Sequence, residues 1–528
     1  MSSVVFARKA SGLTREASLW DAVLFAIADF GGAVGIWYYH LAYYTFPGVI
    51  HVFTILLGGV LLILGPAIAF GILAAAMPRS GGIYVYNTRT LHPAIGMTFS
   101  FLKACGSVAW LSVLTPWIAN PGLRIFAGCV GLSPDAVAWA SEPWGIYLVA
   151  TICVVIGYVI LIAGMRTYFR VQMALMLWNL IAVAICGIVF SMYSHDAFVS
   201  AWNTIATKCG APTWSEVFNL VPPEYSNPQP SVISSLGAIL PLTWVVLYIA
   251  TVTFIGGEVK NPRRNLFLSF IISAVLYLAL TLWVTIGLER IVGYDGAHVL
   301  SYIDNEGPDW YTMPFSPMYL NIASLLVGIG SPLSYFLGLS FLLGNFMWVF
   351  TCTIAFSRAL FAWGMDQLGP TWFTDVNPKV SQPLKLLLLM FILSQIGIIG
   401  YAVTGKPLVS FGVEIMDIVA YLFVTMIGAI VFPYRKSIKH IWETSPHKNW
   451  KILGVPVAVI SGIIGIIYGI INLWAAYYSE GLEAFRVVFS ASVLGAIIAG
   501  VAWYYIWKWY RAKQGIDVTL AFKELAPE

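Results

Sequence analysis

Long apolar runs dominate the 528-residue chain, and polar residues gather in the stretches between them. Most runs exceed about 20 residues, which is enough for a helix to cross a hydrocarbon core about 30 Å thick. An open strand edge in lipid would leave backbone groups without hydrogen bonds, so each run is predicted to be a helix. We expect an all-α polytopic membrane protein with 12 transmembrane helices at 18–44, 50–77, 94–125, 143–164, 168–193, 233–256, 265–291, 332–362, 383–403, 410–433, 453–477 and 484–509.

Two of the connections between these spans are long, at about 194–232 and 292–331. The first is rich in proline and polar residues, and the second carries several carboxylates. The second also contains a short apolar piece, "MYLNIASLLVGIG", which is too short to cross a bilayer comfortably. We expect this piece to form a re-entrant or covering helix over the outer face.

Composition and charge agree with this interpretation. Hydrophobic residues make up 59% of the chain and charged residues only 10%, whereas a soluble protein carries about a quarter charged residues. Of the 28 Lys and Arg, 22 fall on the side that holds both termini and five on the other, with Lys103 inside a span. The bias predicts cytoplasmic termini, and a plasma membrane is the expected location. The net charge of +4 is dispersed, which argues against nucleic acid binding.

No motif points to an enzyme. The chain has no His-x-x-x-His pair, no Gly-x-Ser-x-Gly elbow and no phosphate-binding loop, and its six Cys lack a metal-ligand spacing. We therefore expect neither a cofactor nor a metal. Cys129 and Cys209 fall in non-membrane segments on the same side, where they either form a disulfide or remain as two free thiols.

The stretch "AIADFGGAVGIWYYH" (26–40) places a carboxylate and three glycines in the middle of the first span. Asp29 is about 15 Å along the predicted helix, near the midplane. Irregular backbone at this depth is tolerated where it lines a cavity, and broken helices build transporter sites in which freed N–H groups face an anionic group. The alternative is that the glycines only allow close helix packing.

Three further stretches lie on the predicted cytoplasmic side: "MPRSGGIYVYNTRTLHPAIGM" (77–97), "GGEVKNPRRNL" (256–266) and "SRALFAWGMDQLGPTWFTDVNPKVSQP" (357–383). Together they resemble the amino acid–polyamine–organocation permeases, over roughly residues 17–435. The resemblance implies a 5+5 inverted repeat with broken helices 1 and 6 and substrate bound between them. It divides the chain into a cytoplasmic N-terminal segment 1–17, a ten-helix core 18–433 with repeats 18–193 and 233–433, accessory helices 434–509 and a tail 510–528.

The resemblance also implies candidate substrate-binding residues, although the pocket departs from the family pattern. Its aromatic and hydrophobic positions in the sixth span are Tyr248 and Ile249, where the family usually has a Gly beside an aromatic residue. In the first span the candidates are Asp29, Phe30, Gly31, Gly32, Ala33, Val34 and Gly35. Ala33 and Val34 replace a Gly and a small polar residue of the family pattern, and Asp29 falls where the family commonly has Gly. The substrate implied is an amino acid or a related amine.

Three aromatic residues near the predicted midplane, Trp110, Trp244 and Tyr248, either form a cavity wall with a cation–π role or serve only as packing. Asn179 stands where some proton-coupled members have a Lys, which weakens the simplest proton-coupling scheme. Thr351, Thr353 and Ser357 offer hydroxyls for sodium or bond back to their own helix. The coupling ion, proton or Na⁺, therefore stays open.

The charges within the spans lead to a further hypothesis. Asp29 and Lys103 enter from the same side to similar depths, so we expect them to form an ion pair. The pair either meets a proton or a substrate amine, or simply pins two helices together. Glu414 and Asp417 open the tenth span one helical turn apart and form either an outer gate or hydrated interface carboxylates.

The sequence thus favours a secondary active transporter for an amino acid or related amine, working by alternating access with ion-coupled symport or exchange. Its expected partners are the small-molecule substrate and the lipid bilayer. The alternative is a transporter-like sensor that binds a small amine without moving it. The short tail after Lys508 carries no signalling domain, which argues against the sensor.

Overall fold

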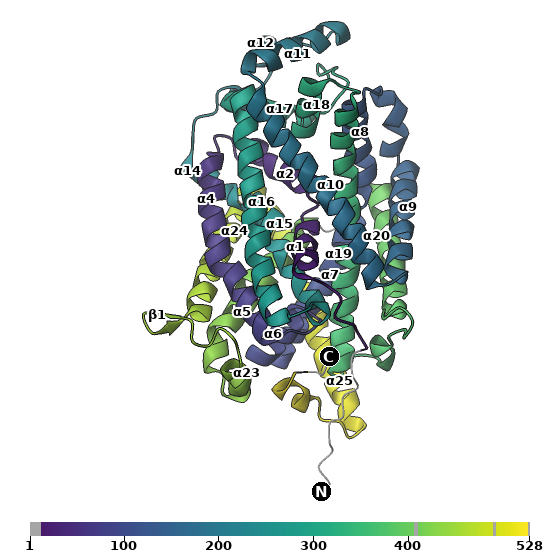
Figure 1. The fold of residues 1–528 in the computed structure, drawn as a ribbon, viewed down its shortest axis with the longest axis vertical. Coiled ribbons are helices and arrows are strands. Elements are labelled where there is room, and N and C mark those ends of the chain that lie inside the picture. The colour runs from purple at the N-terminus through teal and green to yellow at the C-terminus, as the bar shows by residue number, and fades with distance from the viewer. Residues whose placement is uncertain (1–11, 406–409, 489–492, 526–528) are drawn as a thin grey trace.

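The computed structural model describes residues 12–405, 410–488 and 493–525 and is a bundle of long helices with two very short strands. Figure 1 shows the helices running mainly along the long axis of the molecule, with α1 in the middle of the bundle. The elements up to the first long connection are α1 (Leu19–Ala28), α2 (Ala33–His40), α3 (Ala42–Thr45), α4 (His51–Leu62), η1 (Ile63–Ala67), α5 (Ile68–Ala76), α6 (Ile83–Thr90), α7 (Pro93–Leu114), η2 (Ile118–Gly122), α8 (Leu123–Val130), η3 (Pro134–Ser141), α9 (Pro143–Ile162) and α10 (Met165–Met192).

The middle of the chain repeats the pattern of long helices joined by short ones. Its elements are α11 (His195–Cys209), α12 (Trp214–Val217), α13 (Pro223–Ser226), α14 (Val232–Gly237), α15 (Ile239–Val246), η4 (Leu247–Glu258), α16 (Pro262–Val292), α17 (Tyr294–Glu306), α18 (Tyr319–Val327), α19 (Pro332–Met365), η5 (Thr371–Thr374), α20 (Leu384–Thr404), α21 (Ser410–Ile418), η6 (Val419–Val424) and α22 (Thr425–Val431). The C-terminal part holds η7 (Phe432–Tyr434), η8 (Lys436–Ile438), α23 (Lys439–Glu443), the antiparallel pair β1 (Lys451–Ile452) and β2 (Val455–Pro456), α24 (Val457–Val488), α25 (Leu494–Lys513) and η10 (Val518–Lys523).

Within the described residues, 11 helical stretches are long and apolar enough to cross a membrane. They agree closely with the first eleven predicted spans; the third, for example, is expected at 94–125 and runs over Pro93–Val130. The expected twelfth span, 484–509, includes residues outside the described part of the chain. Most of its remainder lies in α25, whose last turns are rich in Trp, Tyr and basic residues and so are less apolar than the other spans.

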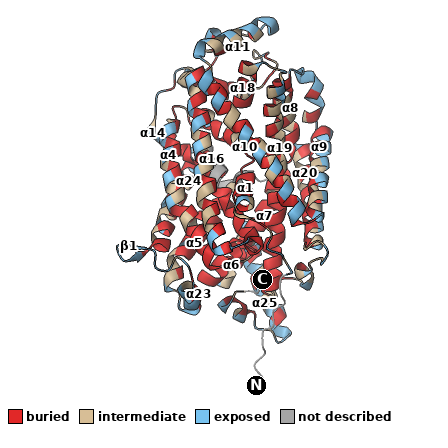
Figure 2. Ribbon diagram, in the orientation of Figure 1, coloured by how far each residue is buried: buried red, intermediate tan, exposed pale blue. Residues whose placement is uncertain are grey.

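The burial pattern is that of a protein embedded in lipid. Figure 2 shows buried residues throughout the centre of the bundle and exposed ones along the outer helices. Many exposed residues on the outer helices are large and apolar, as on α9 (Ile152, Val155, Ile156, Val159) and α20 (Ile392, Ile396, Ile399, Val403). Apolar belts of this extent on a soluble protein would drive aggregation, but in a bilayer they contact acyl chains.

The two ends of the bundle differ in their covering elements. We call the lower end in Figure 1, with α6, α23 and η10, the α6 end, and the upper end, with α11, α17 and α18, the α17 end. The short apolar piece of the second connection forms α18, as expected of a covering helix, and its side chains are buried from Tyr319 to Leu326.

The sequence left open whether Cys129 and Cys209 form a disulfide. In the structure both are free thiols. Cys129 is buried in α8, where its Sγ accepts a hydrogen bond from Asn321 at 3.4 Å, while Cys209 is exposed at the end of α11.

Candidate functional site

The first span is broken at the glycines, as predicted. α1 ends at Ala28 and α2 begins at Ala33, and the backbone between them turns through Gly31 (φ 67°) and Gly32 (φ 54°). A positive φ of this size is unfavourable for residues that carry a Cβ. The glycines also allow close packing, because a Cβ on Gly32 would lie 2.7 Å from Asn179 Oδ1. The glycines therefore both break the first helix and allow close packing against α10.

Side chains from distant helices satisfy the backbone groups that the break exposes. The Ala33 N–H donates to Asn179 Oδ1 at 3.2 Å, so Asn179 caps the first turn of α2. Three carbonyl groups accept from buried side chains: Asp29 O from Trp348 Nε1 at 2.8 Å, Gly32 O from the Tyr277 hydroxyl at 2.5 Å, and Ala33 O from the Tyr319 hydroxyl at 2.9 Å. The break is thus held in one conformation by α10, α16, α18 and α19.

The sixth span changes geometry at the residues that the resemblance had indicated. α15 is an α-helix up to Val246, and the chain then continues as a 3₁₀-helix, η4, through Tyr248 and Ile249. The tighter winding begins without a Gly or Pro at that point, since the nearest is Pro241. A 3₁₀ segment of this length is uncommon and often marks a functional hinge.

A small cavity lies beside the break, between α1, α7, η4 and α19. Five of its lining residues are among the predicted site residues: Asp29, Lys103, Trp110, Trp244 and Tyr248. The others are Ser107, Leu114, Thr251, Trp348, Thr351, Cys352 and Ala355. The structure therefore brings residues from four separate spans to one place near the centre of the bundle.

The polar groups around this cavity are arranged differently from the predicted ion pair. Lys103 Nζ lies 3.2 Å from Asp417 Oδ2, and that oxygen also accepts hydrogen bonds from Trp110 Nε1 and the Tyr248 hydroxyl, each at 3.0 Å. Asp29 instead accepts a hydrogen bond from the Thr251 hydroxyl. The predicted direct Asp29–Lys103 pair is wrong, because α21 brings a second carboxylate closer to the ammonium.

The position expected for Asp417 is also corrected. Its side chain is buried, with only 2% of its surface exposed, and it faces the centre of the bundle instead of a hydrated interface. Glu414, one turn earlier on α21, is half-buried. The difference arises because α21 starts at Ser410 and leads directly into the bundle, so that Asp417 lies two turns below its start.

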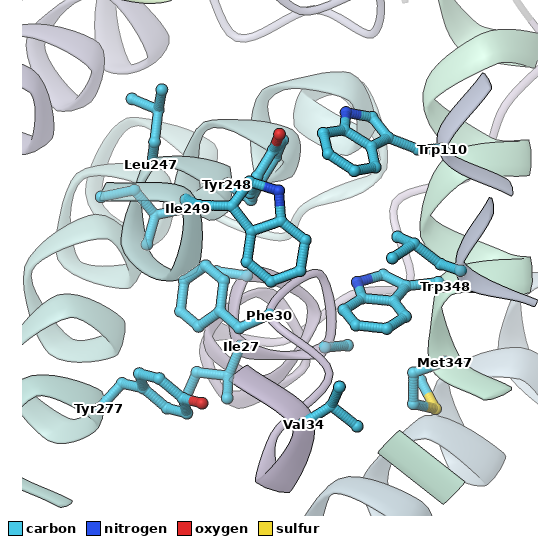
Figure 3. Close-up of a cluster of buried hydrophobic side chains, with 14 of the residues drawn as sticks. Ile27, Phe30, Val34, Trp110, Leu247, Tyr248, Ile249, Tyr277, Met347 and Trp348 are labelled. Atoms are coloured by element: carbon cyan, nitrogen blue, oxygen red, sulfur yellow. The ribbon is translucent and has the colours of Figure 1, made fainter. Parts of the chain in front are cut away.

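Aromatic rings form the wall of the cavity. Figure 3 shows Trp110, Tyr248 and Trp348, which come from α7, η4 and α19, within one cluster of buried side chains. Trp244 completes the set, with its ring centroid 5.6 Å from that of Trp110 and 6.0 Å from that of Trp348. The Lys103 ammonium lies 5.0 Å from the centre of the Tyr248 ring. A site with these walls suits a small ligand that combines an apolar body with a positive charge.

The family model that describes amino acid permeases matches residues 18–501. The chain belongs to the amino acid permease family. The resemblance to the amino acid–polyamine–organocation permeases is thereby confirmed, and the protein is a multi-pass membrane transport protein and not an enzyme. None of the curated proteins compared with the permease matches it.

Several predicted site residues of the permease lie away from the cavity. Phe30, Gly31, Gly32, Ala33, Val34, Gly35 and Ile249 are not among its lining residues, and they pack or cap the broken spans instead. Ser357 Oγ donates to the Ile354 carbonyl at 3.1 Å, which is bonding back to its own helix. Thr353 Oγ1 donates to the Tyr158 hydroxyl at 3.2 Å. These contacts give the two hydroxyls structural partners in this conformation.

The lining residues that the sequence does not assign to a substrate pocket follow helical spacing. Trp348, Thr351, Cys352 and Ala355 are separated by three, one and three residues, so they form one face of α19. Ser107 is one turn after Lys103 on α7, and Thr251 is three residues after Tyr248. The spacing indicates which residues share one face of a helix, but only the fold shows which face of α19 lies at the break.

The three motif stretches of the permease meet at the α6 end. Arg358 of the third donates to Glu258 of the second at 2.7 Å and to Gln382 at 3.1 Å. Arg89 of the first forms a two-bond contact with Asp366 of the third, at 2.8 and 3.1 Å. All four charged side chains are almost fully buried. The motifs therefore join separate parts of the chain below the cavity.

Proposed function

We propose that the permease is a secondary active transporter that moves an amino acid or a related amine across the membrane by alternating access. The observation that carries the proposal is the cavity at the broken first span, lined by residues of four spans. Transporters of this type bind substrate near the midplane, at discontinuous helices, and open the site alternately to each side.

We also propose that the α6 end faces the cytoplasm. The support is the excess of basic residues in the segments on that side, which include Arg79, Arg89, Arg263 and Arg264. Short basic loops are retained on the cytoplasmic side during insertion. In this arrangement the buried Arg–carboxylate contacts close the inner side, and the α17 end covers the outer side.

Uptake by purified permease in sealed vesicles tests the proposal. Labelled amino acids and amines are presented with no gradient, with a proton gradient, with a sodium gradient, or with unlabelled substrate inside. Accumulation above the equilibrium level under one gradient indicates ion coupling, and stimulation only by internal substrate indicates exchange. Binding without flux in all four arms would contradict a transport function.

A matched pair of glycine variants links the flux to the break. Gly31 and Gly210 have the same φ of 67°, so an Ala at either position carries a similar backbone strain. Only at Gly31 would the new Cβ collide, 2.8 Å from the Trp348 ring, whereas nothing lies within 4 Å at Gly210. We expect Gly31→Ala to lose flux at least tenfold and Gly210→Ala to retain it.

A further inference from the structure

The ionisable side chains at the cavity include more acidic groups than basic ones. Asp29 and Asp417 are carboxylates, and Lys103 is the ammonium beside them. Asp417 accepts from Lys103, Trp110 and Tyr248 through a single oxygen, Oδ2, so Asp417 is the direct partner of the Lys103 ammonium. Asp29 has a neutral partner, Thr251, and among the described residues no basic side chain lies within ion-pair distance of it.

Most of the backbone N–H groups that could receive a carboxylate group of a substrate at the break are already bonded within the protein. The Ala33 N–H is bonded to Asn179, and the N–H groups of Phe30, Gly31 and Val34 donate to backbone carbonyls within the break itself. The Asp29 side chain stands at the same break. A second carboxylate there would meet a like charge in a buried site, which disfavours its binding.

The walls of the cavity favour the opposite charge. Four rings, Trp110, Trp244, Tyr248 and Trp348, face the cavity, and the electron-rich faces of such rings attract cations. Trp348 is fixed in orientation because its Nε1 donates to the Asp29 carbonyl at 2.8 Å. The aromatic wall and the Asp29 carboxylate are thus held beside each other by the same residue.

We infer that this site binds a compact monocationic amine that carries no carboxylate beside its nitrogen, with the ammonium at Asp29 and the apolar body against the four rings. The inference rests on the proposed transport function and narrows its substrate class. A zwitterionic α-amino acid places a negative group next to the ammonium and therefore binds less well.

Matched ligand pairs that share a side chain test the inference directly. Phenethylamine is compared with phenylalanine, and isopentylamine with leucine, by displacement and by uptake with the full-length permease in vesicles. We expect each amine to bind at least tenfold more tightly than its amino acid. The methyl ester of phenylalanine removes the carboxylate charge while keeping its bulk, and we expect it to bind more tightly than phenylalanine.

Variants separate the charge of Asp29 from its shape. Asp29→Asn is expected to weaken amine binding at least tenfold and to leave the amino acid unchanged or improved. Asp375→Asn, at an exposed ion pair with Lys385, is the control and is expected to change neither affinity. Should Asp29→Asn fail to fold, Thr251→Val can replace it, because it removes the hydrogen-bond donor to Asp29. The wild-type affinity ratios test the substrate class without any variant.

Two results would overturn the inference, and they are distinguishable. If amino acids bind and are transported as well as or better than the matched amines, the substrate class is wrong while the transport function stands. If neither member of any pair binds or is transported, both the transport function and the inference fail.

Discussion

The two ends of the permease are closed by different kinds of contact. At the α6 end, Arg358 pairs with Glu258 and Arg89 pairs with Asp366, all buried. At the α17 end, Trp37 lies edge-on to Trp117, at 5.6 Å between ring centroids, and its Nε1 donates to Asp304 at 2.9 Å. The α6 end thus has buried ion pairs, whereas the α17 end has aromatic edges and carboxylates that accept from neutral donors, such as Asp304 from Trp37 and Glu289 from Tyr43.

The difference predicts unequal responses to mutation. A buried charge that loses its partner costs about 3–5 kcal/mol, because it is neither hydrated nor paired. An aromatic pair contributes about 0.5–1.5 kcal/mol beyond the area it buries, and a hydrogen bond to a charged group about 1.5–3 kcal/mol. Removing one partner at the α6 end should therefore cost more free energy than removing one contact at the α17 end.

The largest effect is expected for Arg358→Ala. It leaves Glu258 buried without its cation, and we expect the free energy of unfolding to fall by about 3–5 kcal/mol. Thermal unfolding in detergent measures it. The control is Lys385→Ala at the exposed pair with Asp375, where the change should stay under about 1 kcal/mol.

A double variant shows whether the unpaired charge is the cause of that loss. Arg358→Met combined with Glu258→Leu removes both charges and keeps most of the side-chain volume. We expect it to recover most of the stability. A double variant as unstable as Arg358→Ala would point to lost packing and would contradict the proposed difference between the two ends.

A smaller effect is expected for Phe522→Ala. Phe522 in η10 is buried, and its ring centre lies 5.4 Å from the Arg89 guanidinium, so the tail covers the Arg89–Asp366 pair. We expect a loss of about 2–3 kcal/mol, below the usual range for a core Phe because the tail can detach locally. Leu520→Ala, at a residue 39% exposed, is the control for thermal unfolding and should change little.

At the α17 end, Trp37→Phe removes the indole donor to Asp304 while Ser316 remains bonded to the same carboxylate. We expect the closure to weaken by about 1.5 kcal/mol, which corresponds to roughly tenfold faster ligand entry from that end. Exchange of labelled ligand in vesicles measures the rate. Trp144→Phe, at an exposed Trp of α9, should leave the rate unchanged.

The smallest effect is a pH dependence of the same closure. Burial raises the pKa of Asp304, against the hydrogen bonds from Ser316 and Trp37 and the charge of Arg124, which lower it. The form closed at the α17 end therefore binds a proton at Asp304 more tightly than an opened, hydrated form does. This proton stabilises the closed form at low pH, and the stabilisation is lost as the pH rises through the raised pKa of Asp304.

Ligand entry from the α17 end should accordingly be a few-fold slower at acidic pH on that side, by less than about 1 kcal/mol. Initial uptake rates over an acidic-to-neutral pH series measure the effect. Asp304→Asn should abolish it, and an unchanged pH profile in that variant would show that another group is responsible.

Much of the site could be predicted from the sequence, because the relevant residues are unusual for their surroundings. A carboxylate and glycines inside an apolar run identify Asp29 and the break, since neither is favoured in a membrane helix. Lys103 stands out for the same reason. The lining face of α19 does not stand out, because Trp348 and Cys352 are ordinary residues of a buried helix.

The partners of these residues could not be predicted. Lys103 and Asp417 are separated by 314 positions, and Arg89 and Asp366 by 277. Periodicity specifies which face of a helix a residue occupies, but not which distant helix packs against that face. For this reason the sequence predicts the wrong carboxylate partner for Lys103 and does not reveal the pairing among the motif stretches.

The membrane class, the extents of the spans, the family and the location of the break follow from the amino-acid sequence, because each depends on local composition or on short motifs. The fold is needed to know which carboxylate neutralises Lys103, which rings line the cavity and which contacts hold each end of the bundle. These depend on the packing of helices far apart in the chain, where a buried charge pairs with whichever opposite charge the fold brings within reach.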